Sequence, residues 1–472
     1  MFYYCGGLYA VLILWIAALN YIALPDCITP SAEQCLVYLS LTRNNLPLAN
    51  EHVRSSLVNL NKFRSWNTSY SGKCCRMIAG DDCTLRQVKK VKPLSDDQFY
   101  AKFNSCASIR SELYNNYYVS QEEESFPLAY VLLTHSNPRI LFKFLKGVYR
   151  QHNVYCIHYD QKSSPNFKSF IHLLSRCTDN MIIPTKIENV IWGGVSILNA
   201  QLNCYRDLLL YRSTVPWKYA FNLQGHELPL RTNRELVEML QSQPANTSIV
   251  ESWPIRDSVD RSRLTYRAHL LALPGTSVHV VVLSSERLPS LPSSLDLKIH
   301  KSWCFIAVTP EYVHYMLESE LSKTLLNFLQ NVSNAEEYFY ATLYNHELTP
   351  GGRYQSGKGA HYNPSFAVSV CVWLQGVVNR KMYCHGSDSH EYCHFSVRDL
   401  KSLFSLFVNG ELIEPFPVNN YGHGLSPAFV SGTKKAMFFN KYMTDTETTA
   451  MDCLEERLTM QNMLEYYFDH EE

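Results

Sequence analysis

The sequence lacks an excess of charge of either sign. Lysine plus arginine and aspartate plus glutamate both number 43, and only 18% of the 472 residues are charged. A strongly basic face, which nucleic-acid binding requires, is therefore not expected. A hydrophobic fraction of 46% without low-complexity tracts excludes a disordered chain. The length exceeds one compact core, so we expect a catalytic-sized domain with extra segments.

Several catalytic motifs are also missing. The chain contains no G-x-S-x-G nucleophile elbow and no D-x-D pair that could hold a metal on a nucleotide diphosphate. GRYQSGK has P-loop glycine spacing from Gly352 to Lys358, but Gly359 replaces the required Ser or Thr. These patterns indicate neither a serine nucleophile of that type nor a P-loop.

Charge is absent from Phe2 to Pro25, and this apolar stretch is long enough to cross a bilayer as a helix. We predict a tip and signal anchor over residues 1–27; a cleaved signal peptide is the alternative. Either interpretation sends the rest of the chain into the secretory lumen. The 15 cysteines and the N-glycosylation sequons at Asn67, Asn246 and Asn331 favour the same compartment.

Residues 28–105 resemble a polar stem, and a regular pattern follows over 106–472. Apolar runs of strand length alternate with helical periodicity, which predicts a mostly parallel α/β sheet flanked by helices. Strands are expected at 127–135, 154–160, 180–185, 218–225 and 302–309, and helices at 139–151, 166–177, 196–212, 310–329 and 334–345. After Tyr344 the chain is expected to be irregular. Ligands of such sheets bind beyond the strand carboxyl ends, where His135, Asp160 and the QGHELP turn lie.

Two adjacent glutamates open an aromatic run in NVSNAEEYFYATL. In one interpretation Asn334 caps a helix and Glu337 closes a capping box. In the other, one carboxylate is placed for chemistry. Glu336 and Glu337 project about 100° apart on a helix, so both cannot serve one substrate hydroxyl.

The segment CHGSDSHEYCH also has two interpretations. Cys384, His385, His390, Cys393 and His394 could bind zinc. A Cys384–Cys393 disulfide with solvated histidines is favoured in an oxidising lumen.

The stretch FPLAYVLLTH…VYCIHYDQK…NMIIPTKIENVIWGG…LNCYRDLL…WKYAFNLQGHELPLRTNRELV resembles the core 2/I-branching β-1,6-N-acetylglucosaminyltransferases, with peptide O-xylosyltransferases as more distant relatives. The resemblance runs from about Cys74 to Cys453. It implies a Golgi type II membrane protein with a GT-A-like fold that uses a UDP-sugar, inverts the anomeric centre and needs no metal or other cofactor.

The resemblance also implies roles for single residues. The family motif S-P-D-E-x-L-W-A-T aligns with NAEEYFYAT and places the catalytic base on Glu337. A base must deprotonate the acceptor hydroxyl in a single displacement. The phosphate-binding lysine falls on Lys441, with a solvated lysine as the alternative. The family's second phosphate cation, an arginine, is His390 here, unless Arg398 substitutes for it.

Further positions follow from the same alignment. Asp160 matches a uridine contact, His135 lies in the first-strand loop, and Trp192 either stacks on the nucleotide or packs a loop. Glu251 and Trp373 match acceptor contacts, and Arg261 and Arg263 are weaker candidates. Glu227 and Gln224 replace a family Asp and an unpaired family cysteine. The implied disulfides are Cys74–Cys453, Cys106–Cys177, Cys156–Cys204 and Cys384–Cys393, and Cys304 has no assigned partner.

The sequence therefore predicts an inverting transferase that moves a sugar, most simply GlcNAc in β-1,6 linkage, from a UDP-sugar to a glycoprotein O-glycan. UDP-glucose or UDP-xylose are alternative donors. An inactive glycan-binding protein on the same fold is the rival interpretation, prompted by His390. A membrane partner through the anchor is expected, a homodimer is compatible with the stem cysteines, and no nucleic acid is expected.

Overall fold

The computed structural model describes Cys74, Met77 and residues 93–114, 117–273, 279–292, 297–356, 366–370, 384–389, 392–403, 435–440 and 449–470. The chain divides into two compact units, Met1–Lys89 and Lys90–Glu472. The fold below is that of the second unit. The expected anchor and most of the expected stem lie outside the described residues, and no described helix is long and apolar enough to cross a membrane.

A five-stranded sheet in the order β10-β4-β1-β2-β3 forms the centre of this unit. β1 pairs in parallel with β2 and β4, β2 with β3, and β10 runs antiparallel beside β4. The mostly parallel α/β prediction is confirmed. The strands are β1 (Leu128–Thr134), β2 (Val154–Tyr159), β3 (Met181–Ile182), β4 (Tyr219–Leu223) and β10 (Ile306–Val308).

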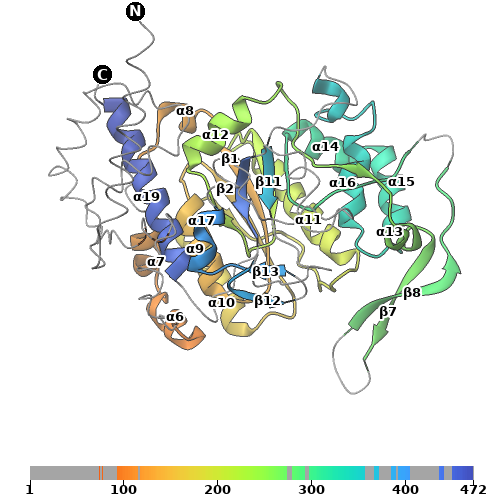
Figure 1. Cartoon of the computed structure of the whole chain (residues 1–472), viewed down its shortest axis with the longest axis horizontal. Coiled ribbons are helices and arrows are strands. Elements are labelled where there is room, and N and C mark those ends of the chain that lie inside the picture. The colour runs from red at the N-terminus through yellow and green to blue at the C-terminus, as the bar shows by residue number, and fades with distance from the viewer. Residues whose placement is uncertain are drawn as a thin grey trace, which may run out of the picture. The chain divides into compact units, whose positions relative to one another are not determined.

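Both faces of this sheet are buried, which explains why its strands are continuous apolar runs. Tyr130 of β1 packs in one core cluster with α9 (Pro138–Val148) and α10 (Pro165–Cys177). Its neighbour Val131 belongs to the other cluster, with α11 (Ser196–Tyr211), α14 (Pro310–Glu318) and α16 (Glu336–Tyr344). Figure 1 shows the sheet between these two helical layers.

One predicted helix is two helices. Pro310 begins α14 as expected, with Thr309 as its N-cap. The single helix predicted over 310–329 is wrong, because Ser319 is extended and its hydroxyl accepts a hydrogen bond from the Ser322 amide. Ser319 thus ends α14 and caps α15 (Glu320–Leu329). Serine favours an N-cap over a helix interior.

Regular structure also follows Tyr344, where an irregular chain was expected. A second sheet in the order β11-β14-β5 and the helix α19 (Thr449–His470) contradict that prediction. β5 comes from the QGHELP turn, about two hundred residues before β14, so no local sequence pattern predicts this sheet.

The remaining strands are β5 (Leu228–Pro229), β6 (Trp253–Pro254), β7 (Tyr266–Ala272), β8 (His279–Arg287), β9 (His300–Lys301), β11 (Phe366–Val370), β12 (Ser387–Ser389), β13 (Tyr392–His394) and β14 (Lys435–Phe439). The remaining helices are α6 (Asp96–Lys102), α7 (Cys106–Leu113), α8 (Gln121–Glu124), α12 (Asn233–Gln241), α13 (Ser258–Arg263), α17 (Leu400–Leu403), η3 (Arg353–Ser356) and η6 (Val397–Asp399).

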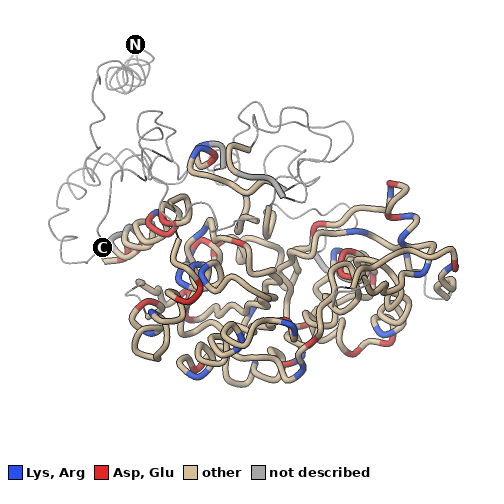
Figure 2. Tube along the Cα trace, turned by 90° about the horizontal axis from the view of Figure 1, so that it is seen from below, with Lys and Arg blue, Asp and Glu red and all other residues tan. Residues whose placement is uncertain are grey.

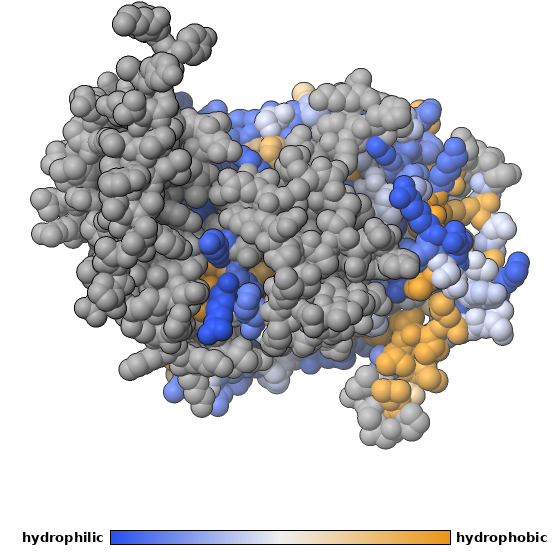
Figure 3. Space-filling view, in the orientation of Figure 1, coloured by the Kyte–Doolittle hydropathy of each residue, from blue (hydrophilic) through white to orange (hydrophobic). Residues whose placement is uncertain are grey.

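The β7–β8 hairpin extends away from the central sheet and carries apolar side chains (Figures 1 and 3). Leu270 and Leu271 are 55% and 51% exposed. Consecutive strand residues point to opposite faces, so both faces of the hairpin are apolar and open. Charged residues of the two signs are interspersed along the trace (Figure 2), in keeping with the balanced composition.

Disulfides connect distant elements. Cys106–Cys177 joins α7 to the end of α10, Cys156–Cys204 joins β2 to α11, and Cys384–Cys393 closes the loop that contains β12. Because Cys384 and Cys393 are bonded to each other, neither sulfur is free to bind zinc as the alternative interpretation required. Cys74 and Cys453 are each disulfide-bonded; their pairing with one another stays a prediction.

Candidate active site

Glu337 lies in the first turn of α16, and its carboxylate is held by two cations. Its Oε2 is 3.2 Å from Lys301 Nζ and 3.5 Å from Arg263 Nη1. The side chain is 21% exposed. Burial raises the pKa of Glu337, and the charges of Lys301 and Arg263 oppose that rise. The site therefore contains a half-buried carboxylate that keeps access to solvent.

The capping-box interpretation of Glu337 is wrong. Ala335 is the N-cap of α16, and no side chain caps this helix. Asn334 has a left-handed backbone with φ of 58°, and its side-chain oxygen accepts from the Ser333 hydroxyl. The Asn334 side chain therefore caps no backbone amide of α16, and Glu337 closes no capping box.

Glu336 faces the other way, into the protein interior. It is 4% exposed, and its Oε2 has no hydrogen-bond partner within the described part of the chain. Burial, followed by the charge of Glu337, raises the pKa of Glu336 to about 8. Of the two adjacent glutamates, only Glu337 is paired with cations and open to solvent.

Asp260, Lys301 and Tyr338 belong to this site and were missed from the sequence. Asp260 Oδ1 accepts from Tyr338 Oη at 2.7 Å and from Lys301 Nζ at 2.8 Å. Asp260 and Arg263 are three residues apart on α13, a spacing that signals an ion pair. Lys301 has no comparable local signal, because its place depends on the pairing of β9 with β6.

The expected acceptor residue Glu251 lies close in the chain to this cluster. It is buried and comes two residues before Trp253 of β6, whose pairing partner is Lys301. Arg263 contacts Glu337, as described; acceptor contacts by Arg263 and Arg261 stay predictions. Trp373 lies outside the described residues.

The expected nucleotide residues gather at the carboxyl edge of the sheet. The Asp160 amide donates to the Thr134 carbonyl at 3.0 Å, and the rings of His135 and His226 are 5.9 Å apart. The Asp160 carboxylate binds Lys162 Nζ at 2.9 Å. The ends of β1, β2 and β4 thus bring His135, Asp160 and the QGHELP turn together, as the parallel sheet requires.

Trp192 lies on a turn that contacts the start of α16. Its side chain is 81% exposed. The next residue, Gly193, has φ of 74° and its carbonyl accepts from the Asn334 amide at 2.8 Å. The indole is therefore not packed into the loop, and its stacking on a nucleotide stays a prediction.

Buried polar groups connect the QGHELP turn to Cys304 and to Asn440. Gln224 Nε2 is 2.8 Å from the sulfur of the buried Cys304. Burial, and then the charges of Glu336, Glu227 and Glu337, raise the pKa of the Cys304 thiol. Glu227 accepts from the Gln224 amide and from Asn440 Nδ2, at 2.9 and 3.0 Å. Gln224 and Glu227 therefore link the QGHELP turn to Cys304 and to Asn440, which follows β14.

Lys441 and His390 lie outside the described residues, as does Asn67. Arg398 lies in η6. Asn246 is exposed and Asn331 is half-buried. Among the described residues no group of three His, Cys, Asp or Glu side chains is arranged to hold a metal ion.

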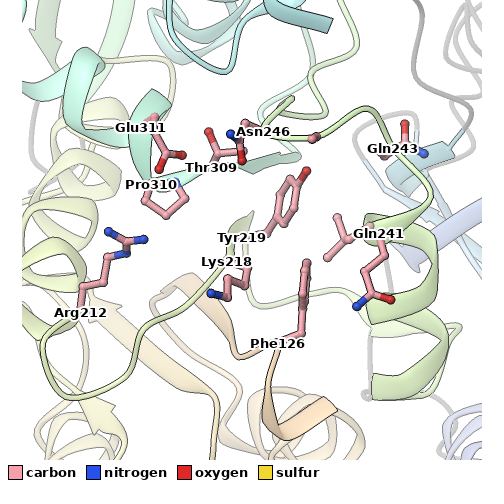
Figure 4. A pocket seen from close by; sticks show the side chains of 12 residues that line it. Phe126, Arg212, Lys218, Tyr219, Gln241, Gln243, Asn246, Thr309, Pro310 and Glu311 are labelled. Atoms are coloured by element: carbon pink, nitrogen blue, oxygen red, sulfur yellow. The ribbon is translucent and has the colours of Figure 1, made fainter. Parts of the chain in front are cut away.

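A separate pocket of about 450 Å³ lies at the opposite end of β4. Figure 4 shows Phe126, Lys218 and Tyr219 pointing toward it from the start of the sheet, with Asn246 and Glu311 at its rim. Ligands of parallel sheets bind at the carboxyl ends of the strands. This pocket is therefore not assigned to the candidate active site.

Three comparisons bear on the identity of the chain. The family model described as "Branch: Core-2/I-Branching enzyme" matches residues 128–403. The human N-acetyllactosaminide beta-1,6-N-acetylglucosaminyl-transferase is 30% identical over 304 residues, which cover 64% of this chain and 72% of that protein. The mouse beta-1,3-galactosyl-O-glycosyl-glycoprotein beta-1,6-N-acetylglucosaminyltransferase 4 is 28% identical over 374 residues, 79% of this chain and 74% of that protein.

Similarity to solved structures is weak. Mouse xyloside xylosyltransferase 1 in its apo form matches with a TM-score of 0.24 and 11% identity, over 57% of this chain and 96% of that chain. A score this low does not establish a shared fold. The family model, in contrast, spans more than half of the chain, including β1, β2, β4 and α16. The chain belongs to the Core-2/I-Branching enzyme family.

Proposed function

We propose that this chain is an inverting glycosyltransferase that transfers GlcNAc in β-1,6 linkage from UDP-GlcNAc to an O-glycan, without a metal ion. Family membership makes the chain a glycosyltransferase. The observation that carries the proposal is the Glu337 carboxylate, held through Oε2 by Lys301 and Arg263. Relatives whose names specify β-1,6-GlcNAc transfer support the sugar and the linkage.

Glu337 would act as the general base. An inverting transfer is a single displacement in which the acceptor hydroxyl attacks the anomeric carbon while UDP leaves. The proton of that hydroxyl passes to the Glu337 carboxylate, and the sugar–oxygen bond forms as the bond to the diphosphate breaks. A positioned base of this kind contributes about 10²–10⁴-fold to the rate.

The substrates would bind on the two sides of Glu337. His135, Asp160 and Trp192 would contact the nucleotide, and Glu251, Arg263 and Trp373 the acceptor. Lys441 and His390 would stabilise the charge that develops on the leaving diphosphate. A protonated His390 suits the mildly acidic Golgi lumen better than a neutral imidazole.

We also propose a Golgi membrane location with the catalytic domain in the lumen, on the strength of the apolar stretch before Asp26. The disulfides of the structure are compatible with an oxidising compartment.

The test is a donor comparison. The full-length chain receives UDP-GlcNAc, UDP-glucose or UDP-xylose with a Gal-β-1,3-GalNAc acceptor in EDTA, and product linkage is determined by NMR. A β-1,6-GlcNAc product is expected. A product from another UDP-sugar would replace the donor assignment, and a requirement for added metal would refute metal independence.

The second candidate is a glycan-binding protein without transfer activity, which the replacement of a phosphate arginine by His390 favours. Glycan binding without UDP release from any donor would establish it. In that case Glu337→Gln would leave glycan affinity unchanged.

A further inference from the structure

The Lys301 ammonium bridges two carboxylates. Nζ lies 2.8 Å from Asp260 Oδ1 and 3.2 Å from Glu337 Oε2, and the side chain is 17% exposed. The backbone fixes the same arrangement, because the amide of the next residue, Ser302, donates to the Glu337 carbonyl at 2.7 Å. β9 and α16 are therefore joined at the residue that carries the carboxylate.

The Asp260 carboxylate holds the Lys301 ammonium in place. Its side chain is 1% exposed, and Oδ1 accepts from Tyr338 Oη, Lys301 Nζ and, at 3.5 Å, Arg263 Nη1. The Asp260 amide in turn donates to the capping side chain of Asp257 at 2.7 Å. A buried carboxylate with several donors on one oxygen is held in a single orientation.

Only one of the two carboxylate oxygens of Glu337 takes part in its ion pairs. Lys301 and Arg263 both contact Oε2. Within the described part of the chain, no hydrogen bond involves Oε1. One oxygen of the carboxylate is therefore fixed by the protein while the other is left for a substrate.

We infer that Lys301, held by Asp260, is a positioning residue that fixes Oε2 of Glu337, favours the ionised form of this carboxylate and leaves Oε1 to receive the acceptor proton. The inference rests on the proposed function, in which Glu337 is the base. Arg263 comes from the same helix as Asp260 and makes the longer contact, so Lys301 is the principal cation.

The surroundings of Glu337 explain why a cation is needed. Burial raises its pKa, Lys301 and Arg263 lower it, and Asp260 raises it again. Glu336 and Tyr338 are its neighbours on α16, and the Cys304 thiol interacts electrostatically with both glutamates. Without Lys301, burial and the charge of Asp260 would be opposed by Arg263 alone, so the carboxyl would keep its proton to a higher pH.

The experiment compares wild type with Lys301→Met, Lys301→Gln and Lys301→Arg in the full-length chain. An opposite charge within this distance moves a carboxyl pKa by about one to three pH units. The acid limb of the kcat/KM profile is expected to move up by about one pH unit or more in the Met and Gln variants. Activity then falls about tenfold at pH values below the wild-type acid limb and largely recovers at high pH, while Lys301→Arg restores the wild-type limb.

Lys298→Met is the matched control, because Lys298 is an exposed lysine of the same segment. Its profile should match wild type. Equal losses at every pH in Lys301→Met and Lys301→Gln would assign Lys301 a merely structural role. A raised KM for the acceptor with an unmoved acid limb would assign it to acceptor binding. Either result overturns the inference.

A second readout is independent of activity. Glutamate Cδ carbons are labelled with ¹³C, and the Glu337 signal is identified by its loss in Glu337→Gln. Its titration should move to higher pH in Lys301→Gln. If wild type transfers no sugar but this shift is present, the proposed function fails and the electrostatic role of Lys301 stands. An unmoved titration refutes the inference whatever the activity.

Discussion

Glu336 should make the stability of this protein fall as the pH rises. Its carboxyl group is buried without a partner for Oε2 in the described part of the chain, and its pKa is raised to about 8. The unfolded chain releases the same proton near pH 4.5. Between these values the folded state binds more protons than the unfolded state, so each pH increase favours unfolding.

The magnitude follows from the linkage relation. One pH unit in this interval corresponds to about 1.4 kcal/mol for one proton, so the change from pH 5.5 to 7.5 costs about 2.7 kcal/mol. Glu336→Gln cannot titrate and loses this contribution. The difference between the two pH values should therefore be about 2.7 kcal/mol smaller in Glu336→Gln than in wild type.

Equilibrium urea unfolding followed by tryptophan fluorescence at pH 5.5 and 7.5 measures this difference. Glu347→Gln is the control, because Glu347 is exposed and follows the same helix; it should keep the wild-type difference. If Glu336→Gln and wild type lose the same free energy between the two pH values, Glu336 does not hold a proton in the folded protein and the reasoning is refuted.

Three further predictions concern the scaffold. Replacing Cys106 and Cys177 with serine removes a disulfide between residues 71 apart in the sequence. The free energy of unfolding should fall by about 4 kcal/mol, measured from the urea midpoint; an unchanged midpoint would contradict this prediction. Glu455→Gln should cost about 2–3 kcal/mol, because Glu455 binds Lys143 and Lys146 at 2.5 Å each. Burial raises the pKa of Glu455 but the two lysines lower it overall, so this contribution is present at neutral pH and lost as the pH falls below 4.5; a variant as stable as wild type at pH 7 would refute the pairing. Leu270→Ala should change stability by less than about 0.5 kcal/mol, whereas the fully buried Leu208→Ala should cost about 2–5 kcal/mol; equal costs in thermal melts would contradict the exposure of the hairpin.

The central sheet could be predicted because each of its main strands is buried on both faces. β1, β2 and β4 are therefore continuous apolar runs, and the polar residues that end them mark the carboxyl edge. The break at Ser319 was missed because the apolar pattern continues on both sides of it. The β11-β14-β5 sheet was missed because its strands meet only through distant parts of the chain.

The candidate site, like the fold, could be predicted from the sequence only in part. Glu337 was found through the resemblance of its motif, and Glu336 was separated from it by helical geometry. Asp260 and Lys301 were missed because their contact joins residues 41 apart, and Tyr338 reaches Asp260 across 78 residues. Periodicity describes one element at a time, so it cannot place side chains from α13, β9 and α16 around one carboxylate.

The central claim is that Glu337, and not Glu336, is the catalytic base. Acceptor-dependent UDP release by the full-length chain in EDTA tests it most directly, with Glu337→Gln and Glu336→Gln as a matched pair of adjacent substitutions. We predict that Glu337→Gln loses about 10²–10⁴-fold of the wild-type rate, while Glu336→Gln keeps most of it at pH 7. Wild-type activity that survives in Glu337→Gln, or that is lost only in Glu336→Gln, would contradict the account.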